Sequence, residues 1–167
     1  MRSLLLGTAI VLVGAALPVH AGKHGGAASR PERTRAGHLV FEKNCASCHG
    51  ARGEGAPDWQ HRDAKGELPP PPLDAHGHAW KHADGMLYRL VRDGWRDPFN
   101  KTERLTMPAF GQALPPRQIQ AVIEYLKTLW TPGQRRFQLG ESRREPFPSD
   151  ARSSDGQGPN GGTPSPR

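Results

Sequence analysis

The 167-residue sequence predicts an all-α domain, because helix signals stand at both of its ends and between them. Residues 29–32, Ser-Arg-Pro-Glu, form a capping box with an early proline, which predicts a helix running to about Asn44. Apolar residues recur at helical spacing over 83–93, and a last helix is expected within 115–133. The apolar positions of that last helix are Ile119, Val122, Ile123, Leu126, Leu129 and Trp130.

The first 21 residues have the pattern of an export signal. Arg2 is positively charged, residues 4–17 are almost wholly apolar, and small residues lie around the cleavage position after Ala21. The apolar run is shorter than the roughly 18 residues that a spanning helix needs. We therefore expect cleavage after Ala21, a periplasmic location and no stable membrane span afterwards. The alternative is that the segment stays as an N-terminal anchor.

Composition divides the rest of the chain. Small and polar residues make 22–30 a flexible N-terminal segment, and 31–131 is expected to be the single folded domain. Residues 132–143 are expected to form an irregular strap. A tail rich in proline, glycine and serine, 144–167, has Phe147 as its one large apolar residue and is expected to be disordered.

The mature domain has little apolar material with which to build a core. Only 35% of the chain is hydrophobic, and part of that lies in the export signal. The chain has only two cysteines, three positions apart, so it has no disulfide framework. A large apolar cofactor is the natural substitute. Nucleic acid is not an expected partner, since 31–131 has 14 lysines and arginines against 12 acidic residues.

The segment Cys45-Ala46-Ser47-Cys48-His49 has the spacing at which haem c is attached. Residues three apart share one face of a helical turn, so both thiols can meet the two vinyl groups on one edge of the macrocycle. His49 can then place an imidazole nitrogen on the iron. A thioredoxin-like redox pair would need a strand before the motif, and a zinc site would need two more ligands at suitable spacing; neither is clear.

With this motif the sequence resembles the class I cytochromes c over 31–130. Further matching features are Gly37-x-x-x-Phe41 before the motif, Pro71-Pro72-Leu73 after it and Met107-Pro108-Ala109-Phe110, which begins 58 residues after His49. The resemblance implies a helical domain wrapped around one covalently bound haem. It also implies a close crossing of the first and last helices, to which Gly37, Phe41 and Tyr125 correspond.

The sixth iron ligand expected from the resemblance is Met107. Pro108 biases Met107 towards extended backbone, from which a thioether can be presented to the iron. Met86 lies in the helix expected over 83–93 and is interpreted as packing. The alternatives are that Met107 only packs on the haem edge, or that the cluster His76, His78 and His82 binds a zinc or copper ion or supplies the sixth ligand.

The resemblance also implies a proline carbonyl that accepts the N–H of the proximal imidazole. Pro71 is the candidate because Pro71-x-Leu73 has the family spacing, although three neighbouring prolines at 69, 70 and 72 leave the register open.

Histidine and methionine ligation would fill both axial positions of the iron. The expected function is therefore that of a monohaem cytochrome c that transfers single electrons between a donor and an acceptor redox protein, and not that of an enzyme. The alternatives are a haem subunit of a larger oxidoreductase, and a haem sensor or enzyme with a labile sixth ligand.

Overall fold

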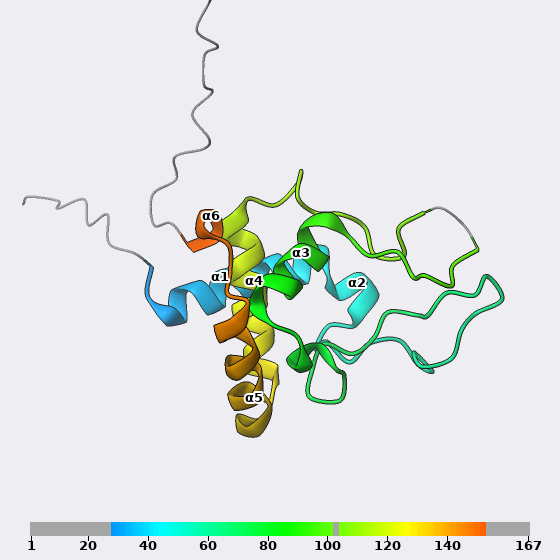
Figure 1. The fold of residues 1–167 in the computed structure, drawn as a ribbon, viewed down its shortest axis with the longest axis horizontal. Coiled ribbons are helices and arrows are strands. Elements are labelled where there is room, and N and C mark those ends of the chain that lie inside the picture. Colours follow the sequence, from blue (N-terminus) through cyan, green and yellow to red (C-terminus); the bar gives the residue numbers. More distant parts are fainter. Residues whose placement is uncertain (1–27, 102–103, 153–167) are drawn as a thin grey trace, which may run out of the picture.

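The computed structural model describes residues 28–101 and 104–152, and Figure 1 shows their arrangement. The elements are α1 (Arg30–Asn44), α2 (Ala46–His49), the 3-10 turn η1 (Ala79–Lys81), α3 (Asp84–Asp93), α4 (Pro116–Leu126), the 3-10 turn η2 (Lys127–Leu129), α5 (Pro132–Arg144) and α6 (Ser149–Arg152). Within these residues the only extended pairing is an isolated bridge between Trp95 and Met107, which confirms the all-α class. The expected export signal lies outside the described residues.

Helix α1 starts at the predicted capping box. The Ser29 hydroxyl accepts the Glu32 N–H, and the Glu32 carboxylate accepts the Ser29 N–H at 2.6 Å, so two N–H groups of the first turn are satisfied reciprocally. Only Gly37 and Phe41 of α1 are buried, and both lie where the helix crosses α4. Helix α1 therefore contacts the core mainly where it crosses α4.

The crossing of α1 and α4 needs a glycine. A Cβ atom on Gly37 would lie 1.9 Å from the carbonyl oxygen of Ala121, far inside van der Waals contact. Phe41 is 0% exposed, and its ring centroid is 5.3 Å from that of Tyr125. The close contact expected at Gly37, Phe41 and Tyr125 is thus present.

The core is centred on the apolar face of α4. Pro115 precedes this helix and Pro116 is its first residue, where a missing N–H costs nothing. The buried apolar cluster is made of Phe41, Ala79, Leu87, Tyr88, Leu114, Ile119, Val122, Ile123, Leu126, Trp130, Phe147 and Ala151. No helix within 28–101 and 104–152 is both long and apolar enough to cross a membrane.

The expectation of an irregular strap over 132–143 is wrong, because these residues form helix α5. Thr131 and Gln134 make a second capping box, with the Gln134 N–H donating to the Thr131 hydroxyl at 3.2 Å. Pro132 follows the cap directly and is the first residue of α5, a position that suits a residue without an N–H. The two buried residues of α5 are polar, Gln138 and Ser142, so the helix shows no apolar periodicity.

The tail expected to be disordered from residue 144 is also packed as far as Arg152. Phe147 is 5% exposed and Ala151 is buried, and both belong to the core cluster. The Gly85 N–H donates to the Glu145 carbonyl at 2.9 Å, which holds this segment against the start of α3. Residues 153–167 lie outside the described part. Two buried side chains, one backbone hydrogen bond and the ion pair of Arg89 with Glu145 thus dock a segment of low overall hydrophobicity.

Buried polar groups join α5 to α3. The Gln138 amide donates to the Asp84 carboxylate at 2.7 Å and to the Ser142 hydroxyl at 2.8 Å. The Asp84 N–H donates to Ser142 at 3.0 Å, and the Lys127 ammonium lies 2.8 Å from the Asp84 carboxylate. The buried carboxylate is thereby paired and hydrogen-bonded, as a buried charge must be.

Gly37→Ala should lower the free energy of unfolding by about 3 kcal/mol or more, because the new methyl group meets backbone that cannot move aside without separating α1 from α4. Gly140→Ala is the matched control: Gly140 is within α5 with nothing within 4 Å of its added Cβ, so it should gain about 0.5–1 kcal/mol. Urea unfolding of both proteins measures the difference. Equal stability of the two variants would show that the helices do not approach so closely.

Phe147→Ala should cost about 3 kcal/mol of unfolding free energy, because it removes a buried ring from the core cluster. The control is Phe137→Ala, at a side chain on α5 that is 51% exposed, which should cost much less. Thermal unfolding distinguishes the two.

A chain ended at Arg144 should lose at least as much unfolding free energy as Phe147→Ala, whereas one ended at Arg152 retains both buried residues of the segment. Equal melting temperatures of these two truncated chains would mean that the segment does not dock.

Candidate functional site

The two cysteines lie on a single helical turn. Cys45 caps the short helix α2, and its carbonyl accepts the N–H groups of Cys48 and His49 at 3.1 and 2.9 Å. The Cys45 N–H in turn donates to the Phe41 carbonyl at 2.8 Å, so the turn continues directly from α1. The core contact of α1 therefore fixes where the two thiols lie.

The His49 side chain is buried and held by one hydrogen bond. Its Nδ1 lies 2.8 Å from the Pro71 carbonyl oxygen, which can only accept, so Nδ1 bears the hydrogen. Burial lowers the pKa of His49, and the bond to Pro71 offsets part of that effect. The ring is therefore neutral at pH 7. Within the described residues Nε2 has no hydrogen-bond partner, and its lone pair is free to bind a metal.

Backbone pairing holds Pro71 in place. The Ala56 N–H donates to the Pro70 carbonyl at 2.9 Å, and the Gly53 carbonyl accepts the Leu73 N–H at 2.7 Å. Gly55, with a φ of 75°, permits this approach, because a Cβ there would lie 2.4 Å from the Pro72 nitrogen. Residues 53–56, which follow the cysteine motif, are thus hydrogen-bonded to the proline segment on both sides of Pro71.

The two thiols differ in environment. Cys45 is half-buried and Cys48 is exposed, and neither is in a disulfide. Burial, with a smaller effect from the neighbouring Cys48, raises the pKa of Cys45 to about 11. Cys45 therefore stays protonated at neutral pH, which slows its oxidation, because the thiolate is the reactive form.

Met107 lies in the bridge with Trp95, where each residue donates its N–H to the carbonyl of the other at 2.9 Å. Its backbone is extended, as Pro108 led us to expect, and its side chain is half-buried. Just after it, the Phe110 N–H donates to the Val91 carbonyl at 3.0 Å, so the chain returns to the end of α3. The methionine is therefore on a loop that begins and ends at one helix terminus.

The other sequence candidates lie elsewhere. Met86 is half-buried within α3, where a packing role was expected. His78 stacks on Trp59 with ring centroids 5.7 Å apart, and His82 meets the edge of His78 at 5.4 Å. His76 instead hydrogen-bonds to the Asp74 carboxylate at 3.2 Å. Within 28–101 and 104–152 no group of three or more His, Cys, Asp or Glu side chains is placed to hold a metal ion.

These residues fit a haem. The site combines two thiols on one helical turn, a neutral imidazole whose Nε2 is free, and a methionine thioether on a separate loop. Apolar side chains near that loop are only partly covered by protein: Trp95 and Leu105 are exposed, and Val91 and Phe110 are half-buried. A large apolar ring would cover such side chains, in agreement with the thin protein core.

Comparison with known families agrees with this assignment. The model of the cytochrome c family matches residues 34–130, more than half of the chain. The chain therefore belongs to the cytochrome c family, whose members are electron-transfer proteins that carry covalently bound haem c. Helices α5 and α6 lie beyond the matched residues.

One curated protein is similar over part of its length. The cbb3-type cytochrome c oxidase subunit FixP of Sinorhizobium medicae (strain WSM419) is 30% identical over 95 residues, which is 56% of this chain and 29% of that protein. The chain thus matches less than a third of its relative. No solved structure matches the chain significantly.

The free energy of unfolding should fall as the pH drops below about 6.5, partly because of the stacked histidines. Burial lowers the pKa of His78 and of His82, with Lys81 adding to both effects. Above that pH, His78 and His82 are mostly neutral in both the folded and the unfolded chain. Below it the unfolded chain binds protons that the folded chain resists, so folding loses stability.

Urea unfolding at several pH values tests this effect. The double variant His78→Gln, His82→Gln should show a shallower decline between pH 7 and 5 than the unaltered protein. The control is His76→Gln, at a side chain that is 88% exposed. Identical slopes in the double variant and the unaltered protein would contradict the expected linkage.

Proposed function

We propose that this protein is an exported, single-haem electron carrier of the periplasm. In this proposal Cys45 and Cys48 bind the haem covalently, His49 and Met107 ligate its iron, and Pro71 orients His49. Its partners are a donor and an acceptor redox protein, and it is a carrier and not an enzyme. When bound, haem c supplies a one-electron couple between ferrous and ferric iron.

The observation that carries the proposal is the oriented imidazole beside the cysteine pair. The hydrogen bond from His49 to Pro71 fixes the tautomer and leaves Nε2 as the donor atom. A metal-ligating histidine is commonly held in this way, since its second nitrogen must be satisfied when the ring is buried. Cys45 and Cys48 lie on the same helical turn as His49, so both thiols can reach one haem.

Met107 supports a carrier in preference to a reactive site. A thioether ligand from Met107 would keep oxygen and peroxide from the haem iron, and it would raise the reduction potential relative to two histidine ligands. The export and periplasmic part of the proposal depends on the signal pattern in residues 1–21.

A second candidate function is that of a haem subunit in a larger oxidoreductase. It is favoured by the similarity to a protein named as an oxidase subunit. Purification from native membranes distinguishes the two roles: a subunit copurifies with other polypeptides, whereas a free carrier elutes at the size of one small domain.

Met107→Ala should abolish the methionine-to-iron charge-transfer band, lower the midpoint potential and allow cyanide or carbon monoxide to bind readily. The reason is that the short alanine side chain leaves the sixth position open. Absorption spectra, redox titration and ligand titration measure the three effects.

Met86→Ala is the matched control, since it removes the same side chain from α3. It should cost about 2 kcal/mol of stability and leave spectrum and potential unchanged. An unchanged spectrum and potential in Met107→Ala would show that another side chain is the sixth ligand, and His78 and His82 would be replaced next.

A further inference from the structure

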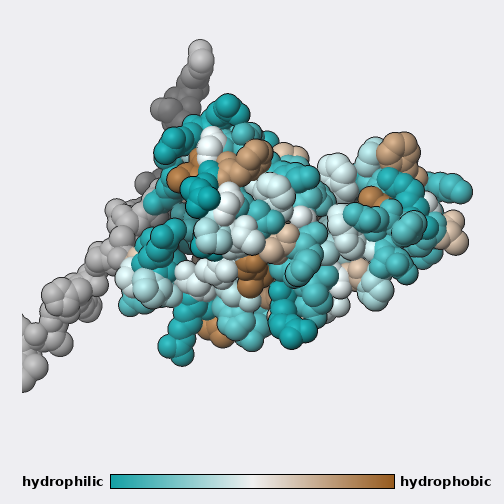
Figure 2. Space-filling view, turned by 90° about the horizontal axis from the view of Figure 1, so that it is seen from below, coloured by the Kyte–Doolittle hydropathy of each residue, from teal (hydrophilic) through white to brown (hydrophobic). Residues whose placement is uncertain are grey.

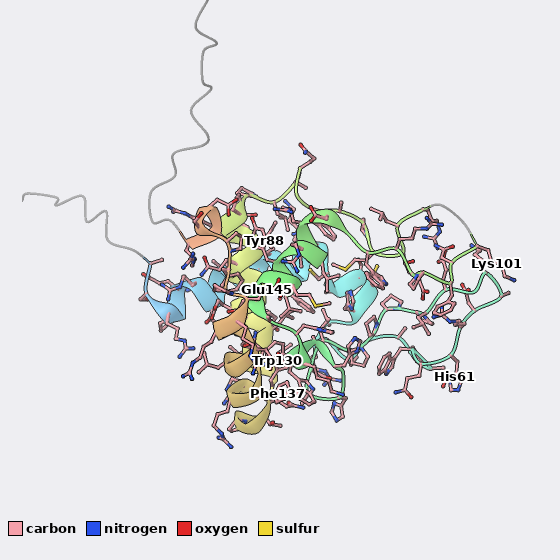
Figure 3. The ribbon with its side chains drawn as sticks, viewed as in Figure 1. His61, Tyr88, Lys101, Trp130, Phe137 and Glu145 are labelled. Carbon is pink, nitrogen blue, oxygen red and sulfur yellow. The ribbon has the colours of Figure 1, made fainter. Side chains whose placement is uncertain are left out.

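Two loops pack on one another and project away from the helices. They comprise residues 57–70, 95–101 and 104–106, and we name them the two-loop lobe. The lobe extends from the helical body at the right of Figure 1 and stands apart in the space-filling view of Figure 2, where its surface is mostly hydrophilic. His61 from one loop and Lys101 from the other lie at its far end (Figure 3).

A buried carboxylate joins the two loops. Asp97 is 2% exposed, and one of its oxygens lies 2.6 Å from the Arg62 guanidinium and accepts the Leu68 N–H at 3.4 Å. Its other oxygen accepts the Phe99 N–H at 2.9 Å. Arg62 and these backbone bonds hold the pKa of Asp97 below its usual range, so the carboxylate is charged at neutral pH.

Further charged groups repeat the connection. Arg104 pairs with Glu67, a second buried carboxylate. Arg62 also donates to the Gly66 carbonyl at 2.6 Å and lies over the Phe99 ring at 4.6 Å from its centroid. Each loop therefore supplies an arginine that pairs with a carboxylate of the other loop.

Apolar burial contributes little to the lobe. Phe99 is 69% exposed, and Trp95 and Leu105 are exposed as well. Buried charge is expensive unless it is paired, so an uncompensated carboxylate would favour opening of the loops. The lobe is therefore held mainly by its charged pairs, and removing one of them should open the loops without disturbing the helical core.

The carboxylate network continues into the methionine loop. The Asp97 N–H donates to the Thr106 hydroxyl at 3.1 Å, one residue before Met107. Trp95, two residues before Asp97, forms the bridge to Met107. Asp97 thus connects the two sides of the Met107 loop, directly next to the bridge between Trp95 and Met107.

The same network reaches the segment that holds the histidine. Arg62 and Leu68 lie on the loop that ends at Pro70, whose carbonyl accepts the Ala56 N–H, and the next residue, Pro71, holds His49. The loops that position the two proposed iron ligands are therefore connected to each other at Asp97.

We propose that Asp97, with Arg62 as its partner, is a positioning residue that restrains the Met107 loop and so keeps the methionine sulfur on the iron. This inference rests on the proposed function, in which Met107 is the sixth ligand. The ion pair between the buried Asp97 carboxylate and the partly exposed Arg62 limits opening of the loop, and in its absence external ligands compete more easily for the iron.

The test compares Asp97→Asn with Asp93→Asn in the haem-loaded protein. Asp93 is the control because it also pairs with an arginine, Arg92, at the exposed end of α3, with Nε and Oδ1 2.7 Å apart. Both variants replace a carboxylate by an amide, so they change the net charge equally. Asp97→Asn should bind imidazole to ferric haem at least about tenfold more tightly, because the loop is open for a larger fraction of time. It should also weaken the methionine-to-iron band and lower the midpoint potential, whereas Asp93→Asn should do neither.

Amide hydrogen exchange gives a readout that does not use the haem chemistry. The N–H groups of Trp95 and Met107 in the bridge should exchange faster in Asp97→Asn than in Asp93→Asn. Those within α4 should be unchanged, which separates loop opening from general instability.

If Asp97→Asn yields no haem-loaded protein, Arg62→Gln decides, because this arginine is partly exposed and its loss leaves the backbone bonds to Asp97 in place. Arg62→Gln should also raise the affinity of the ferric haem for imidazole. Equal imidazole affinity and exchange in the altered and control proteins, with the methionine band intact, would overturn the role of Asp97 and leave the carrier function standing. An unaltered protein without that band would overturn both proposals.

Discussion

The hydrogen bond between His49 and Pro71 is the constraint on which the site depends. A single carbonyl oxygen decides which imidazole nitrogen bears the hydrogen and which is free, and it fixes the plane of the ring. To place that oxygen, residues on either side of it must pair with the segment that follows the cysteines. The positive φ of Gly55 permits this pairing, which uses the Pro70 carbonyl on one side and the Leu73 N–H on the other.

The protein uses two kinds of cohesion. The helical body is held by apolar burial around α4, by the close approach at Gly37 and by the buried network of Asp84, Gln138 and Lys127. The two-loop lobe is held by arginine and carboxylate pairs, of which Arg62 and Arg104 reach solvent. Ionic strength therefore acts on the lobe through these pairs, since partly exposed pairs are screened more than buried ones.

The sequence predicted those features that are encoded locally. The capping box at Ser29, the cysteine turn and the extended backbone at Met107 each depend on a few adjacent residues. The register of the four prolines stayed open because each of them has the same local chemistry. Helix α5 was missed because Pro132 is equally consistent with the end of one helix and the start of the next, and because Gln138 and Ser142 are polar. The pair Arg62 and Asp97 is separated by 35 residues without periodicity, so no pattern indicated it.

Similarity to a family and cooperative folding need not end at the same residue. The family match stops at residue 130, yet Phe147 and Ala151 fill part of the core that α3 and α4 build. A recombinant domain cut at the homology boundary would present an apolar depression to solvent in place of those side chains, and self-association would be the expected result. The packed unit extends to Ala151 at least, and a fusion partner or purification tag should be joined after Arg152.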